Sequence, residues 1–128
     1  MRLLVDSHPL IWAVDDPSRL SPWAATAIQD PANDLFLGAG SIWEIAIKVG
    51  LKKLTLTLPF GQWMNQAVAD LGLSVLPITV GYAEVVSALP LHHRDPFDRL
   101  LVAQAQTEGV PIVSAGPAFD PYGVTRLW

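Results

Sequence analysis

Four carboxylates in this sequence follow an apolar run or open a helical pattern, at positions where their side chains could meet. Asp6 directly follows the apolar run 3–5, Glu44 lies near the start of an apolar helical pattern, and Asp95 and Asp98 open the segment DPFDRLL. Carboxylate oxygens are the ligands that Mg²⁺ and Mn²⁺ prefer. Two or three convergent carboxylates can hold such an ion, activate water and stabilise the leaving oxygen of a phosphodiester. The pattern therefore indicates metal-assisted hydrolysis, provided that the fold brings these residues together.

Asp95 and Asp98 also have structural explanations. Asp95 followed by Pro96 is typical of a helix N-cap and the first helical residue. Asp98 falls at the third helical position, where the helix dipole favours a negative charge. The spacing favours the capping role for Asp95 and leaves both roles open for Asp98.

Glu44 and Asp6 can be explained structurally as well. Glu44 lies three residues after Ser41, as in a capping box, and four residues before Lys48, the favourable order for a helical ion pair. Asp6 abuts an apolar run, and a buried carboxylate is costly unless it is paired or bound to a cation. Asp6 could instead cap the following helix, although Ser7 is also available for that role.

The apolar pattern alternates between short β-compatible runs and helical segments. This alternation is typical of an α/β fold with a mostly parallel sheet, and we expect residues 1–128 to form one domain. The expected strands are residues 2–5, 35–39, 73–78, 110–114 and 123–128. The expected helices are residues 10–14, 22–30, 41–50 (ended by Gly50), 60–71, 80–89 and 95–108, with a loop or edge piece at 51–58.

Polar residues gather where the predicted strands end. In open parallel sheets, ligands bind beyond the carboxyl ends of the strands. Asp6 follows the first strand, Glu44 lies in the first turn after the second, and Ser114 follows the fourth. Helix starts share this edge when their connections are short, so Asp98 is expected to join them.

The composition excludes several classes of protein. With 51% hydrophobic and 16% charged residues, the chain is not disordered, and without cysteine it has no disulfide, thiolate metal site or cysteine nucleophile. No apolar stretch is long enough to span a membrane and RLLV is too short for a signal peptide, so we expect a cytoplasmic protein. The net charge of −4 argues against simple phosphate-backbone binding, but not against a nuclease whose acids are neutralised by metal ions.

Basic and imidazole side chains near the acids are candidates for substrate contacts. Arg94 and Arg99 flank the acidic pair and could contact phosphate, or only neutralise the neighbouring carboxylates. Lys48 begins a small basic patch that could contact an RNA backbone or simply be solvated. His8 is expected in a turn after Asp6. The adjacent pair 92–93 is expected to be solvated in a loop rather than to bind the metal, because imidazole suits zinc or copper more than magnesium.

Other phosphate-handling motifs are incomplete or absent. The segment GAGSIW supplies two glycines of a dinucleotide-binding fingerprint, but Trp43 stands at the third position. No GxxxxGK[ST] motif occurs. A phospho-acceptor receiver domain would need a lysine late in the chain, and no lysine follows Lys53.

Four longer segments occur in order along the chain: LLVDSHPLIW, SIWEIAIKVGLKKLTL, LPLHHRDPFDRLLVAQA and IVSAGPAFDPYGVTRLW. Together they resemble the PIN-domain family and, within it, the VapC-type toxins of bacterial toxin–antitoxin pairs. The resemblance implies a three-layer α/β/α fold, Mg²⁺- or Mn²⁺-dependent endoribonuclease activity, a cognate antitoxin and a homodimer. It implies that Asp6, Glu44 and Asp98 are the metal-binding and catalytic acids. Ser7, Asp95 and Ser114 would support them.

One position departs from the family pattern. A fourth aspartate often follows the last core strand in a Thr-x-Asp pattern, whereas this chain has Ser114-Ala115-Gly116 there. Asp120 lies four residues further on. Affinity for hard cations depends on ligand charge, so the departure leaves open one ion or two. It also leaves open a weakly active or inactive PIN-fold module that acts through a partner protein.

Overall fold

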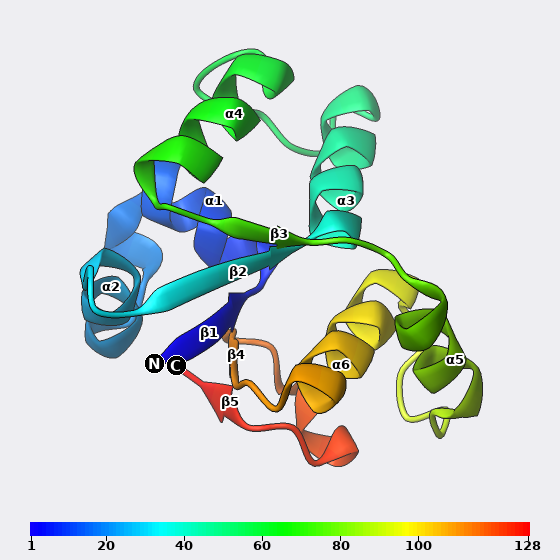
Figure 1. The fold of residues 1–128 in the computed structure, drawn as a ribbon. Coiled ribbons are helices and arrows are strands. Elements are labelled where there is room, and N and C mark those ends of the chain that lie inside the picture. Colours follow the sequence, from blue (N-terminus) through cyan, green and yellow to red (C-terminus); the bar gives the residue numbers. More distant parts are fainter.

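A five-stranded sheet runs through the middle of the molecule, and every neighbouring pair of strands is parallel (Figure 1). The computed structural model describes all residues, 1–128. The strand order is β3-β2-β1-β4-β5. The strands are β1 Arg2–Val5, β2 Asp34–Gly38, β3 Ser74–Leu76, β4 Ile112–Val113 and β5 Arg126–Leu127. The last three are shorter than the sequence predicts.

Helices cover both faces of this sheet, with α1 to α4 on one face and α5 and α6 on the other (Figure 1). The helices are α1 Ser7–Asp15, α2 Pro22–Gln29, α3 Ala39–Gly50, α4 Phe60–Asp70, α5 Val80–Ala88 and α6 Pro96–Glu108. Two short 3-10 helices, η1 Pro17–Arg19 and η2 Pro117–Tyr122, complete the chain. None of the helices combines the length and apolar character needed to cross a bilayer.

The two faces of β1 pack against separate apolar cores. Leu3 and Val5 belong to the core beneath α1, α2, α3 and α4, whereas Leu4 belongs to the core beneath α6 and η2. Successive side chains of a strand point to opposite faces, so a strand buried on both faces is apolar throughout. This arrangement confirms the predicted three-layer α/β/α architecture.

Two helices start earlier than the sequence suggests, α1 at Ser7 and α3 at Ala39. Asp6, not Ser7, is the N-cap of α1, and its side chain accepts a hydrogen bond from the Ser7 backbone N–H. Helix α3 begins at Ala39 after Gly38, so Ser41 lies inside the helix and its buried hydroxyl has no partner. The capping box expected from Ser41 and Glu44 is therefore wrong.

The glycines of GAG lie close to α6. A Cβ atom at Gly38 would lie 2.6 Å from Gln104 Oε1, and one at Gly40 would lie 2.6 Å from a methyl group of Leu100. Both contacts are too short for any other residue without rearrangement. The glycines thus let the start of α3 pack closely against α6, which brings together the two helices that carry acids.

The other end of α3 also differs from expectation. Gly50 is the last helical residue rather than the cap, and the left-handed residue that terminates the helix is Lys52, with φ 58°. The backbone N–H of Lys53 donates to the Lys48 carbonyl, as in a Schellman motif. Residues 51–58 then form a loop without helix or strand.

Candidate metal-binding site

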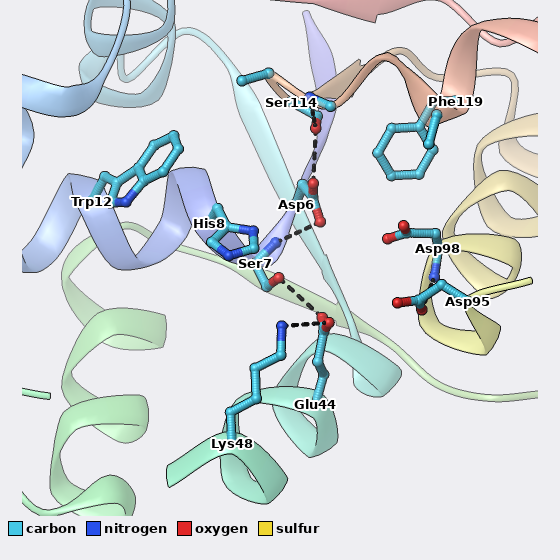
Figure 2. A pocket seen from close by; sticks show the side chains of 13 residues that line it. Asp6, Ser7, His8, Trp12, Glu44, Lys48, Asp95, Asp98, Ser114 and Phe119 are labelled. Carbon is cyan, nitrogen blue, oxygen red and sulfur yellow. Dashed lines mark hydrogen bonds and ion pairs between the residues drawn. The ribbon is translucent and has the colours of Figure 1, made fainter. Parts of the chain in front are cut away.

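The expected acids line one cavity of about 380 Å³ beyond the carboxyl ends of β1 and β4 (Figure 2). Asp6, Glu44 and Asp98 come from three different elements and meet there together with Ser114. The complete lining is Asp6, Ser7, His8, Trp12, Glu44, Lys48, Asp95, Asp98, Ser114, Ala115, Gly116, Ala118 and Phe119.

Asp6 lies at the back of the cavity and is only 7% exposed. Its Oδ1 accepts a hydrogen bond of 2.8 Å from the Ser7 backbone N–H, and its Oδ2 accepts one of 2.8 Å from the Ser114 hydroxyl. Burial raises the pKa of Asp6, the two hydrogen bonds oppose that rise, and the negative charge of Glu44 adds to it. The hydrogen bonds therefore hold Asp6 in one orientation, but they do not offset the full cost of burying its negative charge.

Glu44 lies in the second turn of α3 and is 5% exposed. Its Oε1 accepts a hydrogen bond of 3.0 Å from the Ser7 hydroxyl. Its Oε2 forms the ion pair that the spacing predicts, at 3.0 Å from Lys48 Nζ. Ser7 therefore links Asp6 to Glu44, since its backbone bonds one carboxylate and its side chain the other (Figure 2).

Asp95 and Asp98 have different roles in the structure. Asp95 is the N-cap of α6, and its Oδ1 accepts hydrogen bonds from the backbone N–H groups of Phe97 at 2.8 Å and Asp98 at 3.1 Å. Asp98, at the third helical position, points toward Asp6 across the cavity (Figure 2). Partial burial raises the pKa of Asp98 to about 6, the charge of Asp6 contributes, and a hydrogen bond from His93 opposes the rise.

His93 is a site residue that the sequence analysis missed. Its Nε2 lies 2.8 Å from Asp98 Oδ2, and potential ligand atoms of His93, Asp95 and Asp98 all lie within 4.8 Å of one another. The signal available in the sequence was the position of His93 two residues before an N-cap aspartate. His8 is exposed in the first turn of α1, rather than in a turn, and lines the cavity beside Trp12.

The three basic candidates lie in different surroundings. Lys48 lines the cavity and pairs with Glu44, and Arg94 is exposed at the start of the α6 motif. Arg99 instead turns inward, and its guanidinium donates to backbone carbonyls and to one hydroxyl. These acceptors are the carbonyls of Val86, Leu89, Pro90 and His93 and the hydroxyl of Tyr122. We therefore do not retain Arg99 as an RNA contact.

Gly116 lines the cavity at the position where the family often has an acid. Its φ of −82° suits any residue. A Cβ there would lie 3.4 Å from Ser114 Oγ and 3.8 Å from a ring carbon of Phe119, which are ordinary contacts. Asp120 does not line the cavity and pairs with Arg126 at 2.8 Å. Position 116 thus has room for an acidic side chain, but this chain has glycine there.

The donor set fits a divalent cation. Asp6 and Asp98 both have raised pKa values because burial disfavours their charged forms, and a neighbouring carboxylate adds to the rise, Glu44 for Asp6 and Asp6 for Asp98. A cation held between them would relieve both effects, and carboxylate oxygens match the preference of Mg²⁺ and Mn²⁺. Glu44 could complete the site, directly or through a water molecule.

Comparison with known protein families identifies the class of protein to which this fold and its acidic cavity belong. Residues 3–124 match the family described as PIN domain, and the chain belongs to that family. The predicted family resemblance is confirmed.

Individual relatives agree with this assignment. The chain is 33% identical over 113 residues to a protein named Ribonuclease VapC22 from Mycobacterium tuberculosis, covering 88% of this chain and 85% of that protein. Among solved structures, FitAcB from Neisseria gonorrhoeae matches with a TM-score of 0.65 at 16% identity, over 98% of this chain and 96% of that one. VapBC2 from Rickettsia felis, bound to a DNA fragment from the promoter, matches with a TM-score of 0.64 at 14% identity, over 99% and 98% of the two chains. At these identities the solved structures show the fold.

Proposed function

We propose that this protein is a Mg²⁺- or Mn²⁺-dependent endoribonuclease and the toxin of a toxin–antitoxin pair. The observation that carries the proposal is the meeting of Asp6, Glu44 and Asp98 in one cavity of a PIN-domain chain. The similarity to a protein named as a ribonuclease supports RNA as the substrate. The whole chain, residues 1–128, acts in this proposal as one domain.

Each residue would have a distinct part in hydrolysis. Asp6 and Asp98 would hold the ion, with Glu44 completing the site or assisting as a base. When bound, such an ion lowers the pKa of water and stabilises the negative charge on the scissile phosphate. Ser7 and Ser114 orient the carboxylates by hydrogen bonds, and Lys48 offers positive charge to a phosphate that enters the cavity.

The proposal includes partners as well as a substrate. The similar structure from Rickettsia felis is named VapBC2 and contains promoter DNA. We propose by analogy that this protein binds a cognate antitoxin, forms a homodimer and acts on RNA in the cytoplasm. Lys48 and Arg94 are the proposed contacts to the RNA backbone, because both offer a cation at or near the cavity.

Cleavage of labelled RNA by the purified toxin tests this function. Activity should require Mg²⁺ or Mn²⁺, stop with a chelator, and be lost in Asp6→Asn. Asp34→Asn is the matched control, because Asp34 is exposed at the opposite end of the sheet, at the start of β2. Full activity in the chelator, or in Asp6→Asn, would exclude the proposed mechanism.

Gly116 favours a second candidate, a PIN-fold module that is weakly active or inactive and acts through its partner. That candidate predicts tight antitoxin binding without metal-dependent cleavage. The variant Gly116→Asp separates the two, because the backbone and the space around Gly116 accept a side chain. Restoring the fourth acid should strengthen Mn²⁺ binding, and a large gain in cleavage from a near-zero wild-type rate would support the second candidate.

A further inference from the structure

We propose that His93 is a positioning residue that fixes the orientation of the Asp98 carboxylate, and that Tyr122 and Arg99 hold His93 in place for this purpose. This inference rests on the proposed function, because it concerns how Asp98 is presented to a cation. The observations behind it are a side-chain contact and an unusual set of backbone contacts.

The side-chain contact joins the loop before α6 to the site. His93 Nε2 lies 2.8 Å from Asp98 Oδ2, and the two side chains are 33% and 24% exposed. An ionised carboxylate only accepts hydrogen bonds, so Nε2 donates when Asp98 is charged. This bond occupies Oδ2 and leaves Oδ1 without a protein partner, while the carboxylate points toward Asp6 (Figure 2).

The backbone of His93 is held on both of its polar groups by one hydroxyl. Tyr122 accepts a hydrogen bond of 2.9 Å from the His93 N–H and donates one of 3.3 Å to the His93 carbonyl. Tyr122 lies at the end of η2 and is 9% exposed, so the contact is nearly shielded from water. A loop residue that was merely solvated would leave these groups to water.

Arg99, which lies within α6, and Tyr122 together form what we call the clamp on His93. Its Nη1 donates to the His93 carbonyl at 3.4 Å and to the Tyr122 hydroxyl at 3.1 Å. Its Nη2 donates at 3.1 Å to the carbonyl of Val86 in α5, so the helix before the loop is held by the same guanidinium. The loop between α5 and α6 is thereby fixed to the helix that carries Asp98.

This arrangement assigns His93 a role beside the metal rather than on it. Its Nε2 donates to the ionised Asp98, so that nitrogen carries the proton and has no lone pair for a cation. Hydrogen-bonding partners of metal ligands typically contribute 10- to 100-fold to metal affinity, because they orient the ligand before the ion arrives. His93 is expected to act in this way.

Mn²⁺ affinity of the full-length protein, measured by electron paramagnetic resonance of free Mn²⁺, tests the proposal without relying on cleavage. His93→Ala should bind Mn²⁺ at least about 10-fold more weakly than wild type. His93→Gln, whose amide can still donate to Asp98, should recover most of that loss. Asp34→Asn is the control, because Asp34 is exposed at the opposite end of the sheet, at the start of β2. It should stay close to wild type.

The Tyr122→Phe variant tests the clamp separately, since it keeps the ring and removes only the hydroxyl. It should weaken Mn²⁺ binding by less than His93→Ala, and the two changes should not add when combined, because they act on one bond. Additive losses would overturn the clamp.

Three results would overturn the role of His93. His93→Ala could bind Mn²⁺ like wild type while Asp98→Asn loses binding, which would leave the proposed function intact. His93→Gln could lose as much as His93→Ala, which would make the effect one of packing. Electron spin echo measurements on the wild-type complex could show a directly coordinated imidazole nitrogen, which would make His93 a ligand. Failure of the wild type to bind Mn²⁺ at all would instead overturn the proposed function.

Discussion

Asp6 and Asp98 face the same cavity, yet the chain holds them in different ways. Asp6 and its neighbour Glu44 each accept one local hydrogen bond and one from far away in the sequence: Ser114 is 108 residues from Asp6, and Ser7 is 37 residues from Glu44. We call this group of four residues the sheet side. Asp98 is bonded by His93, five residues away, within the segment 93–98 that also contains Asp95. We call that segment the α6 side.

The difference in construction has an electrostatic consequence. On the sheet side, Asp6 receives two hydrogen bonds that offset part of the cost of its burial. On the α6 side, Asp98 receives one, and its pKa is raised to about 6. Burial raises the pKa of both aspartates, and the two sides differ in how many hydrogen bonds oppose that rise.

The largest expected effect separates the two aspartates of the α6 side. Asp98→Asn should lower kcat/KM by more than about 100-fold, beyond the typical effect of an outer-shell partner. Asp95→Asn should change it little, because asparagine caps a helix as well as aspartate does. RNA cleavage rates at saturating Mg²⁺ check this. Equal losses in both variants would mean that the α6 side acts as one charged unit, contrary to the roles assigned here.

The second effect is a pH dependence of metal binding. Since the pKa of Asp98 is raised to about 6, its carboxyl is protonated below that pH and must lose the proton to bind a cation. Mn²⁺ affinity should therefore fall by at least about tenfold per pH unit below this pKa, because each unit reduces the ionised fraction of Asp98 tenfold and the pKa of the second ligand, Asp6, is raised as well. Calorimetric titrations from pH 7.5 to 5 measure it. A Mn²⁺ affinity that does not change across this pH range would show that Asp98 does not take up a proton there.

The raised pKa of Asp98 also affects the stability of the metal-free protein, in the direction opposite to its effect on metal binding. The folded-state pKa of Asp98, about 6, exceeds its ordinary value of 3.8, so the native state binds more protons in that interval. The contribution of Asp98 to stability is therefore lost as pH rises from about 4 to about 6. Relative to wild type, metal-free Asp98→Asn should gain stability as pH rises through this window, measured by urea unfolding. A difference that does not vary with pH would contradict the shift.

A moderate effect is expected on the sheet side. Ser114→Ala removes a buried hydroxyl that donates to Asp6 and accepts from the Gly116 N–H at 2.9 Å. It should cost about 1–3 kcal/mol of unfolding free energy, because one buried group loses its partner. Ser114→Thr, which keeps the hydroxyl, serves as the control in the same urea titrations. A loss of less than a few tenths of a kcal/mol in unfolding free energy would show that the structure around Asp6 rearranges to replace the lost hydrogen bond.

The smallest effect concerns the ion pair at the rim. Lys48 is about one-third exposed, with 36% side-chain accessibility, and pairs with Glu44 on the same helix. Exposed pairs on one helix contribute about 0.3–0.5 kcal/mol, and Lys48→Gln, whose amide can still donate to the buried Glu44, should leave thermal stability nearly unchanged. Its effect should appear instead as weaker RNA binding, measured by fluorescence anisotropy with an uncleavable analogue. Unchanged RNA affinity would remove Lys48 from the substrate contacts.

The comparison also explains what could be predicted from the sequence. The α6 side is local, so the Asp95–Pro96 cap and the position of Asp98 follow directly from the spacing. The convergence of Asp6, Glu44 and Ser114 could be predicted only coarsely, from the rule that ligands gather at the carboxyl ends of parallel strands. Their hydrogen bonds join distant segments and are set by the packed fold.

The predictions from the sequence that the structure corrects also depend on contacts between distant segments. At the start of α3, the close packing of Gly38 and Gly40 against α6 is a tertiary contact that no local pattern encodes. His93 was missed for a similar reason: its position depends on Tyr122, which is 29 residues away. For Arg99 the sequence leaves open a phosphate contact or the neutralisation of nearby carboxylates, because the inward direction of its side chain is visible only in the fold.

The central claim is that the sheet side and the α6 side hold one cation between them. Anomalous diffraction from crystals soaked in Mn²⁺ locates such an ion directly. The account predicts a peak in contact with carboxylate oxygens of both Asp6 and Asp98, and no such peak in crystals of Asp98→Asn. A peak bound only by His93 and Asp95, or no peak in the cavity at saturating Mn²⁺, would contradict it.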